Sequence, residues 1–369
     1  LLDHDLDLDP KPSPSNMYIL FAAILLVLPL LVLVRKARQR NHGLTNPPPG
    51  PWQLPVIGSL HHLVGALPHR ALRDLALRHG PLMLLRMGEL PVVVASSPEA
   101  AREVMKTHDL TFATRPRTHT FVTLASDSLG IILAPHGEHW RQVRKLCVTE
   151  LLSARRVRSF SGAREAEVAR LVASVASASL ASDRAPVNLT SLFTTYAADT
   201  VVRAVVGDRI ANRDVFLECL EEGLKVGVGF SLADLFPSSR LARALSGTAR
   251  RVEAVVRNMI PLMDCVIEEK HARKSLSAAS AGGGEDQDIL DVLLRIHADG
   301  GPLDMGTIRA VVRDLFGAGS ESASTTLQWA MAELIRNTEA LRRAQSEVRD
   351  ALAGKSRVRE DDLLELPYL

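Results

Sequence analysis

Residues 314–326 read DLFGAGSESASTT, and the sequence on both sides of this stretch has the pattern of one long helix. Apolar or small residues recur there with the i, i+3, i+4, i+7 spacing of a single buried stripe. They stand at positions 308, 311, 312, 315, 316, 319, 322, 323, 327, 330, 331, 334 and 335. Because each glycine inside a helix costs about 1 kcal/mol relative to alanine, Gly317 and Gly319 need an interaction that offsets roughly 2 kcal/mol.

Two explanations account for these small side chains. In the first, glycine and serine let two helix backbones pack closely. In the second, a flat and bulky ligand lies against the bare face of the helix, and Glu321 beside Ser322 supplies a carboxylate and a hydroxyl that relay protons to it. The stretch by itself leaves both explanations open.

Residues 318–322, Ala-Gly-Ser-Glu-Ser, resemble the central-helix signature of the haem-thiolate monooxygenases, the cytochrome P-450 superfamily. That signature reads Ala or Gly, Gly, any residue, Asp or Glu, then Thr or Ser, with Thr commoner than Ser. The resemblance implies that the helix crosses the distal face of a haem, where Ala318 and Gly319 border the cofactor and leave room for oxygen and substrate. It also implies that Glu321 and Ser322 are the catalytic residues, which help deliver protons.

Composition sets the outer bounds. The chain has 369 residues, 46% hydrophobic and 23% charged, which is enough to bury a large core. A net charge of +2 gives no reason to expect nucleic acid as a partner. The three cysteines, Cys147, Cys219 and Cys265, are far apart and form no Cys-x-x-Cys pair, so neither a disulfide framework nor a zinc site is indicated.

The first part of the chain predicts a membrane anchor. Residues 1–16 are acidic and then Pro-rich, and we interpret them as an N-terminal extension. Residues 17–34 carry no charge and would form a helix about 27 Å long, which matches the thin endoplasmic reticulum bilayer. A cleaved signal peptide is the alternative, but basic residues follow instead of a cleavage site. By the positive-inside rule, the sequence predicts a single-pass anchor with the bulk of the chain in the cytosol.

Residues 35–58 form a basic stop followed by a proline-rich hinge. Prolines at 47, 48, 49, 51 and 55 forbid a helix and favour a stiff, extended spacer. A plain linker is the simplest explanation. The order and spacing also resemble the proline-rich hinge that follows the anchor in microsomal members of the family.

Residues 59–369 read as a globular part that is mainly helical. A helix is expected at 71–78 and another at 98–107, with strands at 82–87 and 92–95 between them, similar to the family's small amino-terminal sheet. Residues 112–133 read as a long loop. Helical patterns fill 155–270, and the Ala-, Ser-, Gly- and acid-rich residues 275–288 read as a flexible connector.

A second constellation lies at His139-Trp140-Arg141-Gln142-Val143-Arg144-Lys145. In a helix, Trp140 and Arg144 are i, i+4 neighbours, and a solvated basic face anchored by Trp140 is the ordinary explanation. In the family, Trp-x-x-x-Arg binds a haem propionate, a group that suits the fixed donor fork of arginine. The resemblance therefore implies that Trp140 and Arg144 bind the cofactor, and that Arg141 and Lys145 face an acidic electron donor.

The family's axial ligand is a cysteine in a loop well downstream of the central helix, and no cysteine here follows residue 265. The sequence therefore offers no metal ligand for the haem iron. Glu339 and Arg342 fit the letters of the family's Glu-x-x-Arg motif, but we assign them to an ordinary i, i+3 ion pair. Leu366-Pro367-Tyr368-Leu369 resembles the phrase that precedes the true motif. We expect the chain to be truncated before the Glu-x-x-Arg helix and the cysteine loop.

The fold class we predict is mainly α with a small β-sheet (α+β), an incomplete cytochrome P-450 fold behind an N-terminal transmembrane helix. The resemblance covers residues 17–369 and implies a haem monooxygenase of plant specialised metabolism. Such an enzyme inserts one oxygen atom of O2 into a lipophilic small molecule, with electrons from NADPH through a reductase. Without the axial thiolate, we expect a chain of these residues to be inactive. The alternative is a catalytically silent, membrane-anchored helical protein that binds a ligand or partner.

Overall fold

The structure is a computed structural model that describes residue 27 and residues 46–125, 128–181, 186–208, 210, 212–228, 231–278, 288–355 and 357–369. The chain divides into two compact units, one formed by the residues up to 112 together with 235–243, the other by 113–234 together with 244–369. The described residues are mainly helical with one two-stranded sheet, so the predicted fold class is confirmed at this level.

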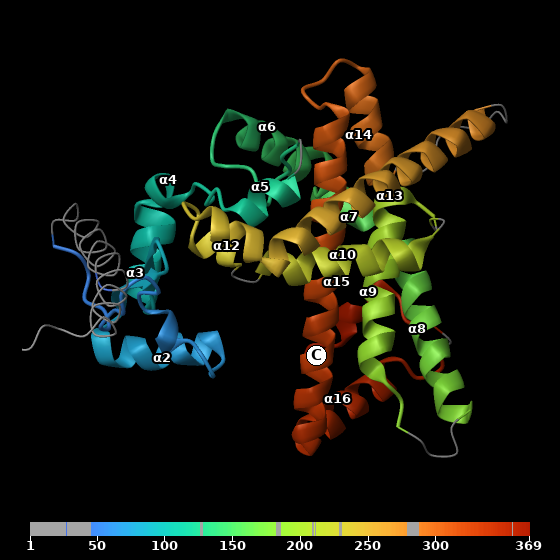
Figure 1. The fold of residues 1–369 in the computed structure, drawn as a ribbon. Coiled ribbons are helices and arrows are strands. Elements are labelled where there is room, and N and C mark those ends of the chain that lie inside the picture. The colour runs from blue at the N-terminus through green and yellow to red at the C-terminus, as the bar shows by residue number, and fades with distance from the viewer. Residues whose placement is uncertain are drawn as a thin grey trace, which may run out of the picture. The chain divides into compact units, whose positions relative to one another are not determined.

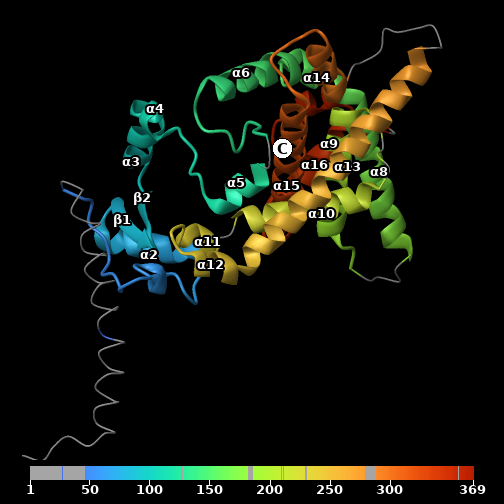
Figure 2. The ribbon, with the colours of Figure 1, turned by 45° about the horizontal axis from the view of Figure 1, so that its top comes forward.

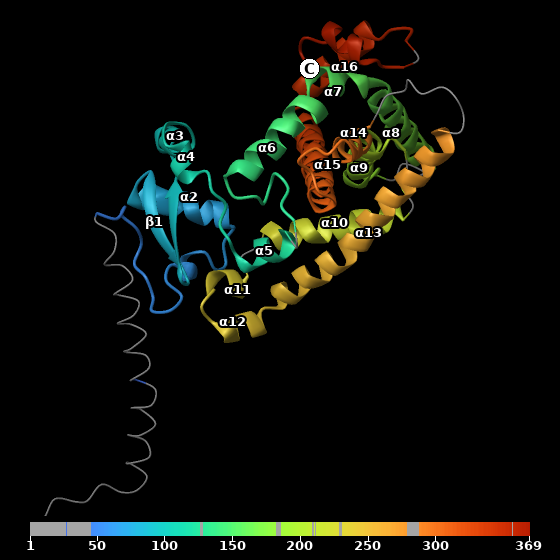
Figure 3. The same cartoon turned by 90° about the horizontal axis from the view of Figure 1, so that it is seen from above.

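The first unit is built around a β-hairpin. Strands β1 (Leu82–Met87) and β2 (Leu90–Ala95) are antiparallel, with Leu82 opposite Ala95. Alternate side chains of β1 are buried, as expected for a strand with one face on a core, and they pack with Leu75 of α2 (Pro68–His79) and with Leu235. Figure 3 shows β1 beside α2.

Helical segments continue the first unit on both sides of the hairpin. A 3₁₀ turn, η2 (Leu60–His62), precedes α2. After β2 come α3 (Pro98–Arg102), the π-helical turn η3 (Glu103–Thr107) and α4 (Asp109–Phe112). Helix α3 begins at Ser97, whose side chain accepts a hydrogen bond from the backbone N–H of Ala100. The predicted helix 98–107 is thus present, and its second half is wound as a π-helix.

The proline-rich segment lies along β1. The backbone N–H of Leu84 donates to the carbonyl of Pro49 at 2.9 Å, and Gly58 forms a bridge with Met87. Gly50 lies so close to Leu84 that a Cβ would overlap the Leu84 carbonyl. Residues 49–53 form no helix, as predicted, but the extended spacer does not continue to 58, because residues 55–57 turn the chain back and Leu54 pairs with Gly58.

The predicted extension 1–16, the predicted anchor 17–34 except residue 27, the basic stop up to residue 45, and 279–287 of the predicted connector lie outside the described residues. Within the part of the chain that is described, no helix combines the length and the apolar character needed to cross a membrane.

The second unit is helical. Its longer helices are α8 (Ser161–Ala181), α9 (Leu189–Val206), α10 (Arg213–Val228), α13 (Gly247–Ala278), α14 (Ile289–Ala298), α15 (Met305–Arg336) and α16 (Thr338–Ala351). Its shorter elements are α5 (His119–Ala125), α6 (Glu138–Leu146), the π-turn η4 (Cys147–Leu151), α7 (Ala154–Ser159) and η5 (Glu360–Glu365). Two further short helices, α11 (Leu232–Leu235) and α12 (Arg240–Leu245), each have residues assigned to both units.

Helix α15 passes through the core of the second unit. It packs most extensively against α9 (Figure 1), and α10 lies along α13 (Figure 2). Ile308, Val311 and Val312 are fully buried in the largest hydrophobic cluster of the described residues. Phe316 stacks edge-on against Phe216 of α10 at 4.8 Å. Because each fully buried aliphatic or aromatic side chain contributes roughly 1.5–3 kcal/mol, this N-terminal half of α15 anchors the unit.

The single long helix predicted around 308–335 is present as Met305–Arg336. It begins where the Asp304 carboxylate accepts a hydrogen bond from the backbone N–H of Thr307 at 2.6 Å. The helix continues through the small-residue stretch without interruption.

The prediction of one long loop over 112–133 is wrong in part, because α5 lies within it. Thr120 of α5 donates its backbone N–H and its hydroxyl to the buried carboxylate of Asp234, at 2.9 and 2.6 Å. Burial opposes ionisation of Asp234, but the hydrogen bonds from Thr120 and Ser231 outweigh it and lower the pKa. Helix α5 is short and depends on a contact with Asp234, more than a hundred residues later, so its own sequence shows no helical periodicity.

Candidate functional site

One face of α15 carries small or polar side chains that the described structure does not cover. Ala318, Glu321 and Ser322 are exposed, and the same spacing continues with Thr325, Thr326 and Trp329. Trp329 keeps 65% of its surface exposed. Residues at i, i+3, i+4, i+7 and i+8 share one side of a helix, so these six side chains form one band, called here the bare stripe.

The other small residues of the stretch lie on the packed face. A Cβ on Gly319 would come within 2.9 Å of the Val201 side chain on α9, and one on Gly317 would touch α10 at 3.5 Å. Ser324 is buried, and its hydroxyl lies 3.0 Å from that of Thr194 on α9. Each of the two explanations for the small residues therefore applies to one face. Of the predicted cofactor-binding pair, Ala318 lies in the bare stripe and Gly319 lies against α9.

The predicted catalytic residues sit side by side in the bare stripe. The Ser322 hydroxyl donates to the Ala318 carbonyl at 2.7 Å, so its proton is directed along the helix while its oxygen lone pairs remain free to accept. Glu321 accepts a long hydrogen bond, 3.3 Å, from the Thr325 hydroxyl. Both side chains are exposed, so a carboxylate and a hydroxyl are available next to each other on the uncovered surface.

Trp140 and Arg144 meet on α6, as the i, i+4 spacing predicts. The guanidinium carbon of Arg144 lies 5.0 Å from the centre of the Trp140 ring, a cation–π distance. The indole N–H of half-buried Trp140 donates to the carbonyl of Ile131 at 3.1 Å. Arg144 itself is exposed, so its donor fork is accessible to an anion.

A short loop connects these two groups of residues. The backbone N–H of Ile132 donates to the Asp314 carboxylate on α15 at 2.9 Å, one residue after the carbonyl that receives the Trp140 indole. Asp314 precedes Ala318 by about one helical turn and faces the same side of α15. Through this loop, hydrogen bonds connect Trp140 to Asp314, one turn before the bare stripe. Sequence reasoning did not single out Asp314, although an acid within a buried helical stripe was the available signal.

Burial governs the charges around this loop. Burial raises the pKa of Asp314, against the hydrogen bonds from the amides of Ile132 and Ile131 and the charge of Arg313. Burial, together with the Asp314 carboxylate, raises the pKa of the nearby Cys147 thiol to about 12. Cys147 therefore stays a neutral thiol at ordinary pH.

These residues fit one side of a haem. The bare stripe begins with the small side chains of Ala318 and Ser322, and Arg144 with Trp140 offers a cationic edge for a propionate. The three cysteines do not match the position of the axial ligand, because Cys147, Cys219 and Cys265 all precede α15 in the sequence. Burial raises the pKa of each thiol. Among the described residues, no group of His, Cys, Asp and Glu is arranged to hold a metal ion.

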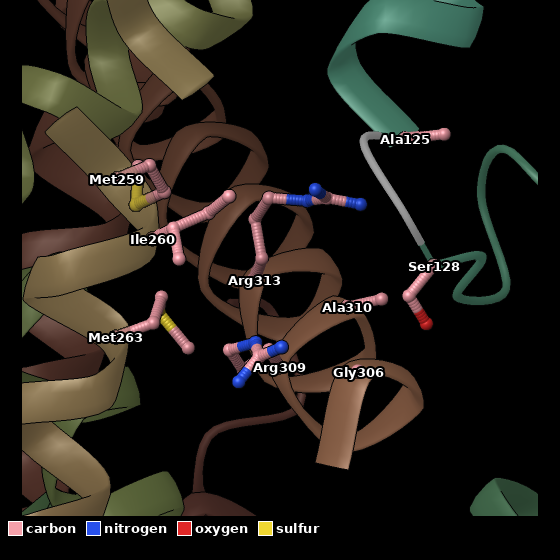
Figure 4. A pocket seen from close by; sticks show the side chains of 9 residues that line it. All are labelled: Ala125, Ser128, Met259, Ile260, Met263, Gly306, Arg309, Ala310 and Arg313. Atoms are coloured by element: carbon pink, nitrogen blue, oxygen red, sulfur yellow. The ribbon is translucent and has the colours of Figure 1, made fainter. Parts of the chain in front are cut away.

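A hollow lies between the end of α5, α13 and the first turns of α15 (Figure 4). It has an empty volume of about 310 Å³, part of it open to solvent. Its apolar wall comes from α13: Met259, Ile260 and Met263. Arg309 and Arg313 of α15 also line it, but Arg309 pairs with Asp264 and Arg313 donates to the Leu124 carbonyl. The hollow lies N-terminal of the bare stripe along α15.

Glu339 and Arg342 form the ordinary ion pair that the sequence predicted. Their charged atoms are 3.2 Å apart within α16, and both side chains are largely exposed. Such a pair contributes little to stability and braces no other element.

Comparisons with known proteins show the family to which the chain belongs. The model of the cytochrome P-450 family matches residues 47–369. Desmethyl-deoxy-podophyllotoxin synthase of Sinopodophyllum hexandrum is 41% identical over 349 residues, which cover 94% of this chain and 67% of that protein. Premnaspirodiene oxygenase of Hyoscyamus muticus is 40% identical, with 94% and 69% covered. Dolabradiene monooxygenase of Zea mays is 44% identical, with 86% and 62% covered.

The chain thus spans about two thirds of the length of these plant relatives, whose names describe a synthase, an oxygenase and a monooxygenase. Membership of the family implies haem as the cofactor and a reductase as the source of electrons. With the match over 47–369 and about two fifths of the residues identical to plant relatives, the chain belongs to the cytochrome P-450 family of haem monooxygenases.

Proposed function

We propose that this protein works as a membrane-anchored haem monooxygenase that inserts one oxygen atom of O2 into a lipophilic small molecule. Electrons would come from NADPH through a reductase. The observation that carries the proposal is the bare stripe, since six neighbouring side chains of a core helix stay uncovered in the described structure and begin at the family signature Ala318–Ser322.

Arg144 and Trp140 would hold a haem propionate. Arg144 is exposed and supplies the positive charge and a fork of N–H donors. Trp140 orients that fork, because its ring lies under the guanidinium and its indole N–H is fixed to the Ile131 carbonyl. Ala318 would border the haem face. When bound, the haem supplies the iron at which O2 is activated.

Ser322 and Glu321 would move protons to the bare stripe. The Glu321 carboxylate is exposed to solvent, and the Ser322 oxygen lies beside it and can accept a hydrogen bond. A carboxylate and a hydroxyl in this order form a short acid–base relay.

The electron donor would dock on the basic surface of α6 and α7. Arg141, Lys145, Arg155 and Arg158 are exposed there. Clustered positive charges of this kind speed association with an acidic partner, and the effect weakens as ionic strength rises.

The membrane part of the proposal rests on residues 17–34 as a single-pass anchor in the endoplasmic reticulum, with the bulk of the chain in the cytosol. Large apolar side chains that follow the anchor support it, because they are exposed between 36% and 80%: Trp52, Leu54, Val56, Ile57, Val64 and Leu67. A cluster of exposed apolar groups marks an interaction surface. Membrane flotation of the full chain, with and without residues 17–34, tests this part.

A haemin titration tests the haem site. Ala318→Phe places a large ring on the bare stripe and should abolish specific binding, followed by Soret absorbance. Ala323→Phe is the matched control, because Ala323 is also exposed on α15 but lies outside the bare stripe. Equal affinity of the two variants would contradict the assignment of the stripe.

We further propose that a polypeptide of these 369 residues has no monooxygenase turnover by itself, because Cys147, Cys219 and Cys265 all precede α15, whereas the family's axial thiolate follows the central helix. In that form it would be a silent, membrane-anchored protein that binds a ligand or partner. A thiolate-type Soret band in its reduced carbonyl complex would refute this.

A further inference from the structure

We propose that Asp314 is a positioning residue, whose carboxylate fixes the loop 129–132 so that Trp140 and Arg144 stand at the end of the bare stripe. The purpose of this positioning, a haem propionate, rests on the proposed function. The positioning itself rests only on contacts within the second unit.

The contacts form a continuous path from α15 to α6. Asp314 accepts the backbone N–H of Ile132 at 2.9 Å, and the Ile131 carbonyl accepts the Trp140 indole N–H at 3.1 Å. A second connection runs in parallel, because His139 hydrogen-bonds the carbonyl of Leu129 at 2.8 Å. The loop therefore has α15 on one side and two consecutive residues of α6 on the other.

Gly130 allows the loop to approach α15 this closely. A Cβ at this position would overlap the Asp314 carboxylate and would lie 3.0 Å from the backbone of Ala310. Because glycine has no side chain, the loop can come close enough for the Ile132 amide to reach the Asp314 carboxylate. The sequence of the loop and the acid on the helix thus complement each other.

An acid at position 314 is costly unless it has such a role. Asp314 is 7% exposed at the border between the packed face and the bare stripe, and burial opposes its charge. Leucine there would continue the core. It would remove the carboxylate that accepts the N–H of Ile132.

A fluorescence experiment tests the positioning directly. Trp52→Phe and Trp329→Phe, both at largely exposed sites, leave Trp140 as the single tryptophan. In this background, Asp314→Leu should shift the Trp140 emission to the red and increase its quenching by acrylamide. Asp314→Asn should restore the original values, because its side-chain carbonyl still accepts the N–H of Ile132. Gly130→Ala should behave like Asp314→Leu, since it displaces the acceptor without altering it.

Ser324→Ala is the control for general destabilisation. It removes buried hydrogen bonds from the same helix, three turns away, and should leave the Trp140 emission unchanged. Circular dichroism shows which variants fold. Unchanged Trp140 quenching in either Asp314→Leu or Gly130→Ala would overturn the proposal, and so would an equal effect of Asp314→Asn and Asp314→Leu.

A haemin titration of the same variants separates this inference from the proposed function. Affinity should fall by about tenfold or more in Asp314→Leu and Gly130→Ala, the effect of losing one hydrogen bond to a charged group, and stay near the original in Asp314→Asn. If haemin binds none of the proteins while Trp140 responds as described, the proposed function fails and the positioning role of Asp314 stands.

Discussion

Between residues 317 and 324, both faces of α15 carry small side chains, but only one of these faces is packed against other helices. On the packed face, Gly319 and Ser324 lie against α9, where there is no room for a larger side chain. Ala318 is next to Gly319 in the sequence, and Ser322 is two positions before Ser324. Both lie on the bare stripe, where they are exposed in the described structure. Small residues therefore serve close packing on one side and leave an open surface on the other. A change of side-chain size should therefore alter the free energy of unfolding on the packed face and have little effect on it in the bare stripe.

The largest contrast should appear between two aromatic residues of the helix. Phe316→Ala removes a ring that is 1% exposed and stacked on Phe216, so it should destabilise the fold by roughly 3–5 kcal/mol. Trp329→Ala, on the bare stripe, should change stability by no more than about 0.5 kcal/mol. Urea unfolding of both variants measures the difference. A large loss for Trp329→Ala would mean that another element covers the stripe in solution.

A smaller contrast should separate two neighbouring positions. Gly319→Leu forces a side chain into Val201 and should cost about 1–3 kcal/mol, even though leucine is the better helix former. Ala318→Leu faces outward and should change stability by less than about 0.5 kcal/mol. Thermal unfolding of the pair checks this. Similar melting temperatures would show that α9 and α15 are less closely packed than their backbones indicate.

Asp314, at the border of the two faces, should give stability a dependence on pH. Burial raises its pKa above that of the unfolded chain, so between the two pKa values the folded state holds more protons. Its contribution to stability therefore falls as pH rises through that window, by at most about 1.4 kcal/mol per pH unit for one proton. The charged and titratable groups that face it are Arg313 and Cys147, and the Cys147 thiol, with a pKa of about 12, does not titrate there.

Asp314→Asn should remove this dependence. Urea unfolding from about pH 4 to about pH 8 should show its stability advantage over the original chain growing with pH. An advantage that shrinks with pH would mean that the carboxylate is stabilised as an ion, against the effect of burial.

Features of the sequence that act locally could be predicted. The spacing of apolar residues around 314–326 predicted one helix, and Met305–Arg336 is that helix. The apolar, β-type run Leu82–Met87 predicted a strand, which is β1. The i, i+4 spacing of Trp140 and Arg144 predicted that they are neighbours, and the guanidinium carbon of Arg144 lies 5.0 Å from the centre of the Trp140 ring. Each of these depends on residues within a few positions of one another.

Features that depend on distant residues could not be predicted. The hydrogen bond from Ile132 to Asp314 and that from Thr120 to Asp234 each connect parts of the chain more than a hundred residues apart. The pairing of Pro49 with Leu84 is likewise invisible in a proline-rich segment read alone. Periodicity placed residues 319, 322 and 323 in one buried stripe, but only Gly319 lies against α9, and the prediction is wrong for Ser322 and Ala323, which are exposed.

The smallest predicted contrast concerns two serines of α15, and it separates structure from chemistry. Ser324→Ala removes a buried hydroxyl that hydrogen-bonds both Thr194 and the amide of Gln328, so it should cost about 1 kcal/mol. Ser322→Ala loses only an exposed hydroxyl that donates back to its own helix, so stability should change by less than about 0.5 kcal/mol. Chemical denaturation of the two variants measures this difference. If Ser322 instead proves as costly as Ser324, its hydroxyl is part of the packing, and its place in the bare stripe would no longer argue for a role in proton transfer.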